Sequence, residues 1–120
     1  MSRSNFFSKK LETAKTLASN FSTDPIDITT IDNLGVNVSA SSVTDNTGSF
    51  FIDHRIYKDA NNFSDWAELT LSSTPQLADA DATLLINLNQ LPHGQMRLRF
   101  VAAGSTPDGV ADVWVSGKEI

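Results

Sequence analysis

The sequence predicts an all-β protein, a single antiparallel β-sandwich or jelly roll of about eight strands with an N-terminal arm. Serine, threonine and asparagine occupy 34 of the 120 positions, whereas glutamate occurs only three times. These polar residues favour turns and exposed strand faces over helix interiors. From residue 26 onward, apolar side chains recur at every second position, as in strands that bury one face. The length favours one domain, because two would each be too small for a stable core.

The arm is expected at residues 1–24, ahead of a β-sandwich domain at residues 25–120. Its apolar residues have helical spacing but also fit a loose strand, so periodicity leaves both interpretations open. The sequence Asp24-Pro25 closes the segment, because a residue before proline is disfavoured in the helical conformation. The arm carries four basic and two acidic side chains, a local charge of +2 in a chain of net charge −5. The remainder is therefore the more acidic part.

The first half of the domain contains the clearest alternation. A strand is expected to open near residue 26, followed by strands at 33–41 and 49–57. Within 33–41, one face of the strand is apolar and is expected to point into the core, through Leu34, Val36, Val38 and Ala40. The next strand places Phe50, Ile52 and Ile56 on one face beside His54.

The second half is predicted to add strands at 66–71, 84–89, 95–103 and 110–116. The turn Thr106-Pro107-Asp108-Gly109 predicts a hairpin between the last two, since Pro presets φ and Gly accepts a positive φ. Such a hairpin would bring Arg97 and Arg99 close to Trp114. Trp114 is expected to point outward, because the alternate positions on its strand are small or branched apolar residues suited to a core: Ala111, Val113 and Val115.

Composition excludes several classes of function. The chain has no cysteine, which excludes a disulfide scaffold, a Cys-ligated zinc site and a thiol nucleophile. The acidic net charge argues against nucleic-acid binding, and no stretch approaches the roughly 18 apolar residues of a membrane span. His54 and His93 lack a nearby catalytic serine motif. We therefore expect no enzymatic activity and no cofactor.

Two polar loops are weak candidates for metal sites. Residues 59–65 contain Asp59, Asn61 and Asp65 at a spacing similar to calcium loops. The segment departs from an EF-hand, because Ser64 stands where glycine is required and Thr70 where a bidentate glutamate belongs. Asp79 and Asp81, in a second polar loop, are a weaker candidate still.

A carbohydrate site is a further alternative. Small β-sandwiches bind sugars through exposed aromatic rings with Asp and Asn in adjacent loops. Tyr57, Trp66 and the loop at 58–65 could supply these groups. The structural alternative is that Trp66 packs over the edge of the sandwich.

Two segments carry resemblances to known families. FFIDHRIYKDANNFSDWAELTL at 50–71 resembles discoidin-type and related β-sandwich modules, in which an Asn-Trp pair follows such a polar loop. LLINLNQLPHGQMRLRFVAAGSTPDGVADVWVSGKEI at 84–120 is similar to small structural proteins of bacteriophages. The second resemblance implies a capsid decoration or cement protein, located in the virion after assembly in the host cytoplasm. Its partners would be the major capsid protein or other virion subunits.

The arm is the expected anchor in that role. A decoration protein needs a rigid body, a patch that meets the capsid, and often a self-association face with closed symmetry, such as a trimer. The interface is expected to use apolar positions of the arm together with the strand residues discussed above: Phe6, Phe7, Leu11, Leu17, Arg97, Arg99 and Trp114. The alternatives are a carbohydrate-binding module of a phage tail and, less favoured, a small cellular adaptor.

Overall fold

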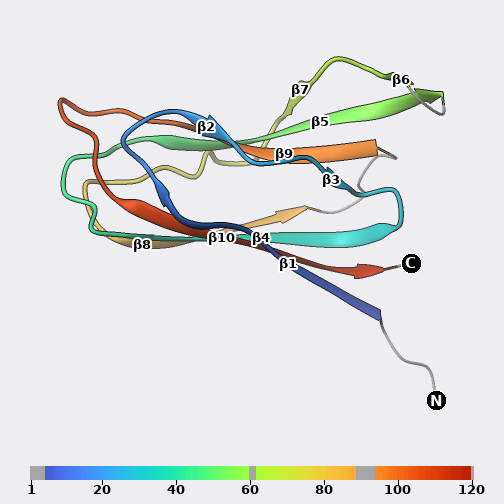
Figure 1. Cartoon of the computed structure of the whole chain (residues 1–120), viewed down its shortest axis with the longest axis horizontal. Helices are drawn as coiled ribbons and strands as arrows, with labels where there is room; N and C mark the ends of the chain where they lie inside the picture. Colours follow the sequence, from blue (N-terminus) through green and yellow to red (C-terminus); the bar gives the residue numbers. More distant parts are fainter. Residues whose placement is uncertain (1–4, 60–61, 89–93, 120) are drawn as a thin grey trace.

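The computed structural model describes residues 5–59, 62–88 and 94–119, and this part of the chain is all-β with antiparallel pairing throughout (Figure 1). It contains ten strands, not the eight that the sequence predicted: β1 Asn5–Thr16, β2 Phe21–Ser22, β3 Ile26–Asp27, β4 Ile31–Ser41, β5 Ser49–Asp59, β6 Asn62–Phe63, β7 Ala67–Leu69, β8 Ala82–Leu88, β9 Gly94–Val101 and β10 Val110–Glu119. Three of the ten, β2, β3 and β6, have only two residues each. Among the described residues, no helix could span a membrane.

The strands form two sheets. Sheet A has the order β1-β10-β4-β8, and sheet B has the order β2-β9-β5-β6, with β3 also paired to β9 and β7 to β5. In Figure 1, sheet B lies above sheet A, and the two termini leave the molecule at the same end. Neighbours in sheet A are far apart in sequence, since β10 lies between β1 and β4. The predicted hairpin of β9 with β10 is therefore wrong, because these two strands belong to different sheets.

The N-terminal segment is a strand in the structure. Residues Asn5–Thr16 pair with β10 along almost its whole length, with irregularities on either side of Glu12 and a positive φ of 47° at Ala14. Periodicity left both helix and strand open for this segment, and the structure shows a strand. Leu17, just beyond β1, is completely buried in the core, and its backbone N–H donates to the carbonyl of Gly109 at 2.9 Å. This segment is thus built into sheet A.

The core lies between the sheets and follows the predicted alternation. Both sheets contribute inward side chains, including Leu34, Val36, Val38 and Ala40 of β4, Phe50 and Ile52 of β5, Met96, Leu98 and Phe100 of β9, and Ala111, Val113 and Val115 of β10. The rings of Phe50 and Phe100 lie with centroids 4.7 Å apart. One predicted inward residue, Ile56, is 44% exposed because β5 runs beyond the core at that end. The predicted inner faces of β4 and β10 are confirmed.

A buried asparagine connects the loops at the opposite end. The Nδ2 group of Asn46 donates to the carbonyls of Leu17 and Asp108 at 2.8 and 3.0 Å, and its Oδ1 accepts from the N–H of Gly48 at 2.9 Å. Its own backbone N–H donates to Oδ1 of Asp79 at 2.9 Å. Because the side-chain nitrogen and oxygen of Asn46 both have hydrogen-bond partners, these bonds offset the cost of burying the amide. They also fix the segments that they join.

Asp108 reinforces this connection from the surface. Its carboxylate accepts hydrogen bonds from the backbone N–H groups of Thr44 and Asp45 and from the hydroxyl of Thr44. The Thr44 hydroxyl bond, followed by the two backbone bonds, holds the pKa of Asp108 below its ordinary value. The positive φ predicted for Gly109 is confirmed at 104°, but the segment 106–109 connects two sheets and closes no hairpin.

Candidate interaction surfaces

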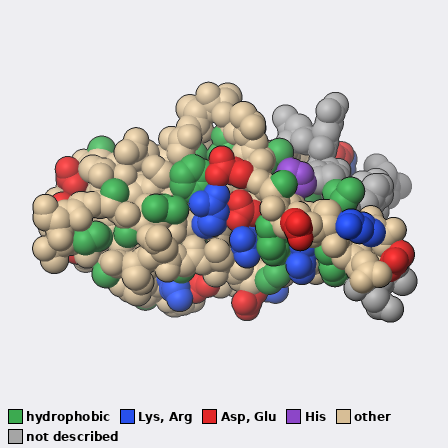
Figure 2. Space-filling model, turned by 90° about the horizontal axis from the view of Figure 1, so that it is seen from above, with side chains coloured by type: hydrophobic (Ala, Val, Ile, Leu, Met, Phe, Trp, Pro, Cys, Tyr) green, Lys and Arg blue, Asp and Glu red, His purple; other side chains and the backbone are tan. Residues whose placement is uncertain are grey.

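The outer face of sheet B carries a closed network of charges. Asp53 on β5 is almost completely buried and lies opposite Arg97 on the neighbouring strand β9. Its carboxylate accepts from Nε of Arg97 at 3.0 Å and from Nε of Arg99 at 3.1 Å, and Nη2 of Arg99 also donates to Glu68 at 2.6 Å. Asp53 chiefly, with Glu68, raises the pKa of Arg99. Figure 2, which looks onto this face, shows the acidic and basic side chains gathered near its centre.

Aromatic rings extend this network along the sheet. The guanidinium carbons of Arg55 and Arg97 lie 4.4 and 4.5 Å from the ring centroid of Trp66, and that of Arg55 is 4.2 Å from the ring of Phe63. Arg99 lies over Phe51 in the same way, at 4.5 Å. Each contact is a favourable cation–π interaction. The arginines of this face therefore already have partners within the chain.

The outer face of sheet A is built differently. A row of cross-strand neighbours runs from Lys10 on β1 through Trp114 on β10 and Asn37 on β4 to Leu85 on β8. Trp114 is 45% exposed and Leu85 is 62% exposed. Lys10 lies 5.5 Å from the Trp114 ring centroid and forms a 3.7 Å ion pair with Asp112. Two large apolar side chains thus stand in solvent on either side of one asparagine.

Small side chains leave a shallow groove beside that row. The next row consists of Ser8, Ser116, Gly35 and Asn87 on the same four strands. A groove of about 420 Å³ runs along it and reaches Leu85. Shallow concave surfaces with exposed apolar side chains are typical of interaction sites. We call this surface, the rows of Trp114 and of Ser116, the sheet A face.

The predicted site residues are distributed over several parts of the molecule. Trp114 points outward as predicted, but Arg97 and Arg99 lie on the other sheet, so the predicted trio does not exist. Leu17 is also removed from the predicted interface, because its side chain is completely buried. Phe7 and Leu11 are partly buried against the core. Their packing within the chain leaves less of each side chain available to a partner.

The calcium candidate is only partly described by the structure. Asn61 lies outside the described residues, and the two carboxylate oxygens of Asp59 accept from the side-chain amide of Asn62, each at 2.9 Å. Within the described ranges, no group of three or more His, Asp and Glu side chains is placed to hold a metal ion. In the second loop, Asp81 accepts from the N–H of Val43 at 2.8 Å. Asp79 likewise accepts a hydrogen bond from the backbone N–H of Asn46.

The aromatic residues that were predicted for a carbohydrate site, Trp66 and Tyr57, have partners within the chain. Trp66 is half-buried under the guanidinium groups of Arg55 and Arg97, and the Tyr57 ring packs on Phe63 with centroids 4.5 Å apart. These rings are engaged within the chain. Among the aromatic side chains that the structure describes, Trp114 is the most exposed, at 45%.

Two structural residues were missed by the sequence analysis. Asp53 alternates with Phe51 and Arg55 on the outward side of its strand, and that pattern alone predicts only a solvated face. The second is Asn46. Two of its side-chain bonds join segments separated by 29 and 62 positions, so no local signal reveals them.

Comparison with known proteins adds no family assignment. Neither the models of protein families nor the curated protein sequences gave a match to this chain.

Proposed function

We propose that this protein is a non-enzymatic structural protein of a phage particle, a capsid decoration or cement protein that binds its particle through the sheet A face. The observation that carries the proposal is the exposure of Trp114 and Leu85 beside a shallow groove, on two rows of residues whose one charged side chain is Lys10. Tryptophan is enriched at the energetic centres of protein interfaces. The partners under this proposal are the major capsid protein or another virion subunit, and the location is the virion.

The strand pairing supports a jelly roll as the finer description of the fold. If β2 with β3 and β6 with β7 are each counted as one interrupted strand, the chain has eight strands. These eight form four antiparallel pairs, which are β1 with β10, β2–β3 with β9, β4 with β8, and β5 with β7. Jelly rolls of two such sheets occur in viral capsid proteins and in lectins. The comparison with jelly rolls is an analogy between folds, so the function has to be argued from the surface of this protein.

The contrast in charge favours the sheet A face as the one that meets the particle. The charged groups of sheet B are paired with one another, and opening them would leave Asp53 buried without its partners. The sheet A face can be covered without breaking an internal ion pair, except the exposed one of Lys10 with Asp112. Burial of Trp114 and Leu85 would then contribute most of the gain.

The test is binding to particles. Phage particles from the source of the sequence, or capsids of that phage lacking this protein, are mixed with the purified chain and sedimented. We expect the wild type to co-sediment and to raise the melting temperature of the capsid, and Trp114→Ala to do neither. Trp66→Ala, an equal truncation on the other face, is the matched control and should bind. No binding by the wild-type chain would refute the proposal.

A carbohydrate-binding module of a phage tail is the second candidate. The specific observation in its favour is again Trp114, which is exposed and is the cross-strand partner of Asn37. An aromatic platform with an adjacent hydrogen-bonding amide is suited to a sugar ring. Binding on a glycan array that is lost in Trp114→Ala, without binding to capsids, would select this function over capsid decoration.

A further inference from the structure

The free edges of the two sheets are not equally protected against pairing with another strand. Exposed edges of regular strands invite pairing, and proteins block them with charges, bulges or short strands. β1 carries Lys9, Lys10, Glu12 and Lys15, and its register is broken on both sides of Glu12. The outermost strands of sheet B have only two or three residues each. These three edges are protected.

The edge at β8 has none of these protections. Its seven residues, Ala-Thr-Leu-Leu-Ile-Asn-Leu, include no charge and no proline. It pairs with β4 in an unbroken register from Ala82 to Leu88, and no described strand pairs with its other side. Leu85, the most exposed large apolar side chain among the described residues, stands at this edge.

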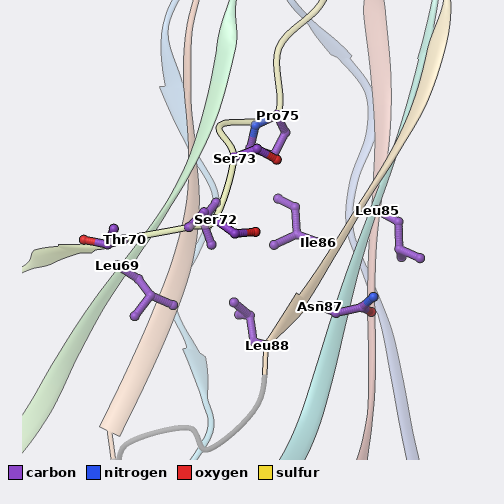
Figure 3. A pocket seen from close by; sticks show the side chains of 10 residues that line it. Leu69, Thr70, Ser72, Ser73, Pro75, Leu85, Ile86, Asn87 and Leu88 are labelled. Carbon is purple, nitrogen blue, oxygen red and sulfur yellow. The ribbon is translucent and has the colours of Figure 1, made fainter.

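A groove next to β8 offers space for the side chains of an added strand. It measures about 320 Å³ and lies between β8 and the segment 69–75. Figure 3 shows Ile86 and Leu88 pointing into this groove, toward Leu69, while Leu85 and Asn87 point to the other side of the sheet. An added strand would thus place alternate side chains in the groove and on the sheet A face.

We propose that the β8 edge binds the β8 edge of a second copy of this chain, in antiparallel fashion about a two-fold axis, so that sheet A continues into its partner. The argument is self-complementarity, which a two-fold interface requires. The occupant must be extended, uncharged and apolar at alternate positions, and β8 itself has this pattern. Pairing centred on Leu85 sets Leu85 against its copy, Leu84 against Ile86, and Thr83 against Asn87.

The chemistry of this pairing matches on both sides of the sheet. Leu84 meets Ile86 on the groove side, Leu85 meets its copy and Thr83 meets Asn87 on the sheet A face, and no charges are opposed. Two-fold pairing of the β1 edge with the β1 edge of a second copy would instead bring the lysines of the two copies together. Pairing of identical edges closes with two copies, so this assembly is a dimer and replaces the trimer expected from the sequence. It does not depend on capsid binding.

The first experiment measures the mass of the full chain in solution. We expect sedimentation equilibrium to give a concentration-dependent dimer. In Leu85→Lys, each lysine would face its copy, and the dimer should weaken by about tenfold or more. The matched control Ser116→Lys adds the same charge on the same sheet face but two strands from the edge, and should dimerise as the wild type does. A wild-type chain that stays monomeric up to millimolar concentration would overturn the proposal.

The second experiment uses the absence of cysteine from the chain. In an antiparallel pair, directly opposed Cα atoms lie about 4.5–5.5 Å apart, a separation that a disulfide spans. Leu85→Cys should therefore form a covalent dimer under mild oxidation, whereas Ser116→Cys should not. Equal cross-linking of both variants, or of neither, would contradict pairing at β8. Capsid binding by either variant is measured separately, so failure of the proposed function would leave this test unaffected.

Discussion

The two outer sheet faces of this protein use their large side chains in opposite ways. On sheet B, Trp66 lies beneath two guanidinium groups, and those arginines also contact Asp53 or Phe63. On sheet A, Trp114 stands in solvent with one lysine near its ring. Both residues looked alike in the sequence, as single tryptophans on or next to predicted strands.

The difference teaches how to separate a structural surface from a binding surface. Side chains whose polar atoms and rings are satisfied within the chain contribute to stability. Side chains that remain exposed and unsatisfied contribute little to it and are available to a partner. Substitutions on sheet B should therefore change the free energy of unfolding, and substitutions on sheet A should change binding.

The largest effect is expected from Asp53→Asn. The neutral amide cannot balance two guanidinium groups at a site where the native carboxylate is almost fully buried. Loss of one partner in such a group should lower the free energy of unfolding by about 2–4 kcal/mol, measured by urea denaturation. Glu68→Gln is the control, because Glu68 is half-exposed and its ion pair is with Arg99; its cost should stay below about 1 kcal/mol. Equal costs would break the comparison of the faces.

Trp66→Ala should have the next largest effect. It removes the ring over which Arg55 and Arg97 lie, and two cation–π contacts of about 0.5–1 kcal/mol each would be lost. We expect the free energy of unfolding to fall by about 1–2 kcal/mol in urea denaturation. A cost no larger than that of Trp114→Ala would show that the sheet B network does not stabilise the fold.

Acid should weaken the loop end of the molecule, independently of both faces. The pKa of Asp108 is lower in the folded chain than its ordinary value of 3.8, so the folded state binds this proton less readily than the unfolded state does. Its contribution is therefore present above the ordinary pKa and is lost as the pH falls through the folded value. Urea midpoints should drop between neutral pH and about pH 3, and less so in Asp108→Asn. Asp65→Asn, an exposed control, should keep the wild-type slope.

The smallest effect on stability is expected from Trp114→Ala. The ring is 45% exposed and makes one cation–π contact with a lysine. The free energy of unfolding should change by no more than about 0.5 kcal/mol, while particle binding is lost. A large loss of stability would place Trp114 among the structural residues and leave the sheet A face without its main binding side chain.

Much of the fold follows from the sequence because alternation is a local signal. The inward faces of β4 and β10 and the outward direction of Trp114 were predicted from period-two patterns alone, and burial confirms them. The same kind of evidence could not decide between helix and strand for residues 5–16. Pairing with β10 decides it, and the partner lies about a hundred positions away.

The predictions that failed concerned neighbours in space. A strong turn at 106–109 predicted that β9 and β10 pair, but the turn instead carries the chain from sheet B to sheet A. Arg97 and Arg99 were consequently assigned to the wrong tryptophan. Leu17 was taken for an exposed anchor because nothing in residues 1–24 indicates that the loop ends of β4, β5 and β10 enclose it. Local patterns gave faces of strands, and only the topology gave their partners.

The central place of β10 in sheet A also determines when that sheet can be completed. β10 follows the other nine described strands in the sequence, yet it lies between β1 and β4. A ribosome making this protein would thus release both neighbours long before the strand that joins them. Sheet A must close after residues 110–119 have emerged, and until then β1 has no partner strand in that sheet. Long-range closure of this kind slows folding. A chaperone that binds β1 until β10 has emerged would increase the yield of native protein without changing its free energy of unfolding.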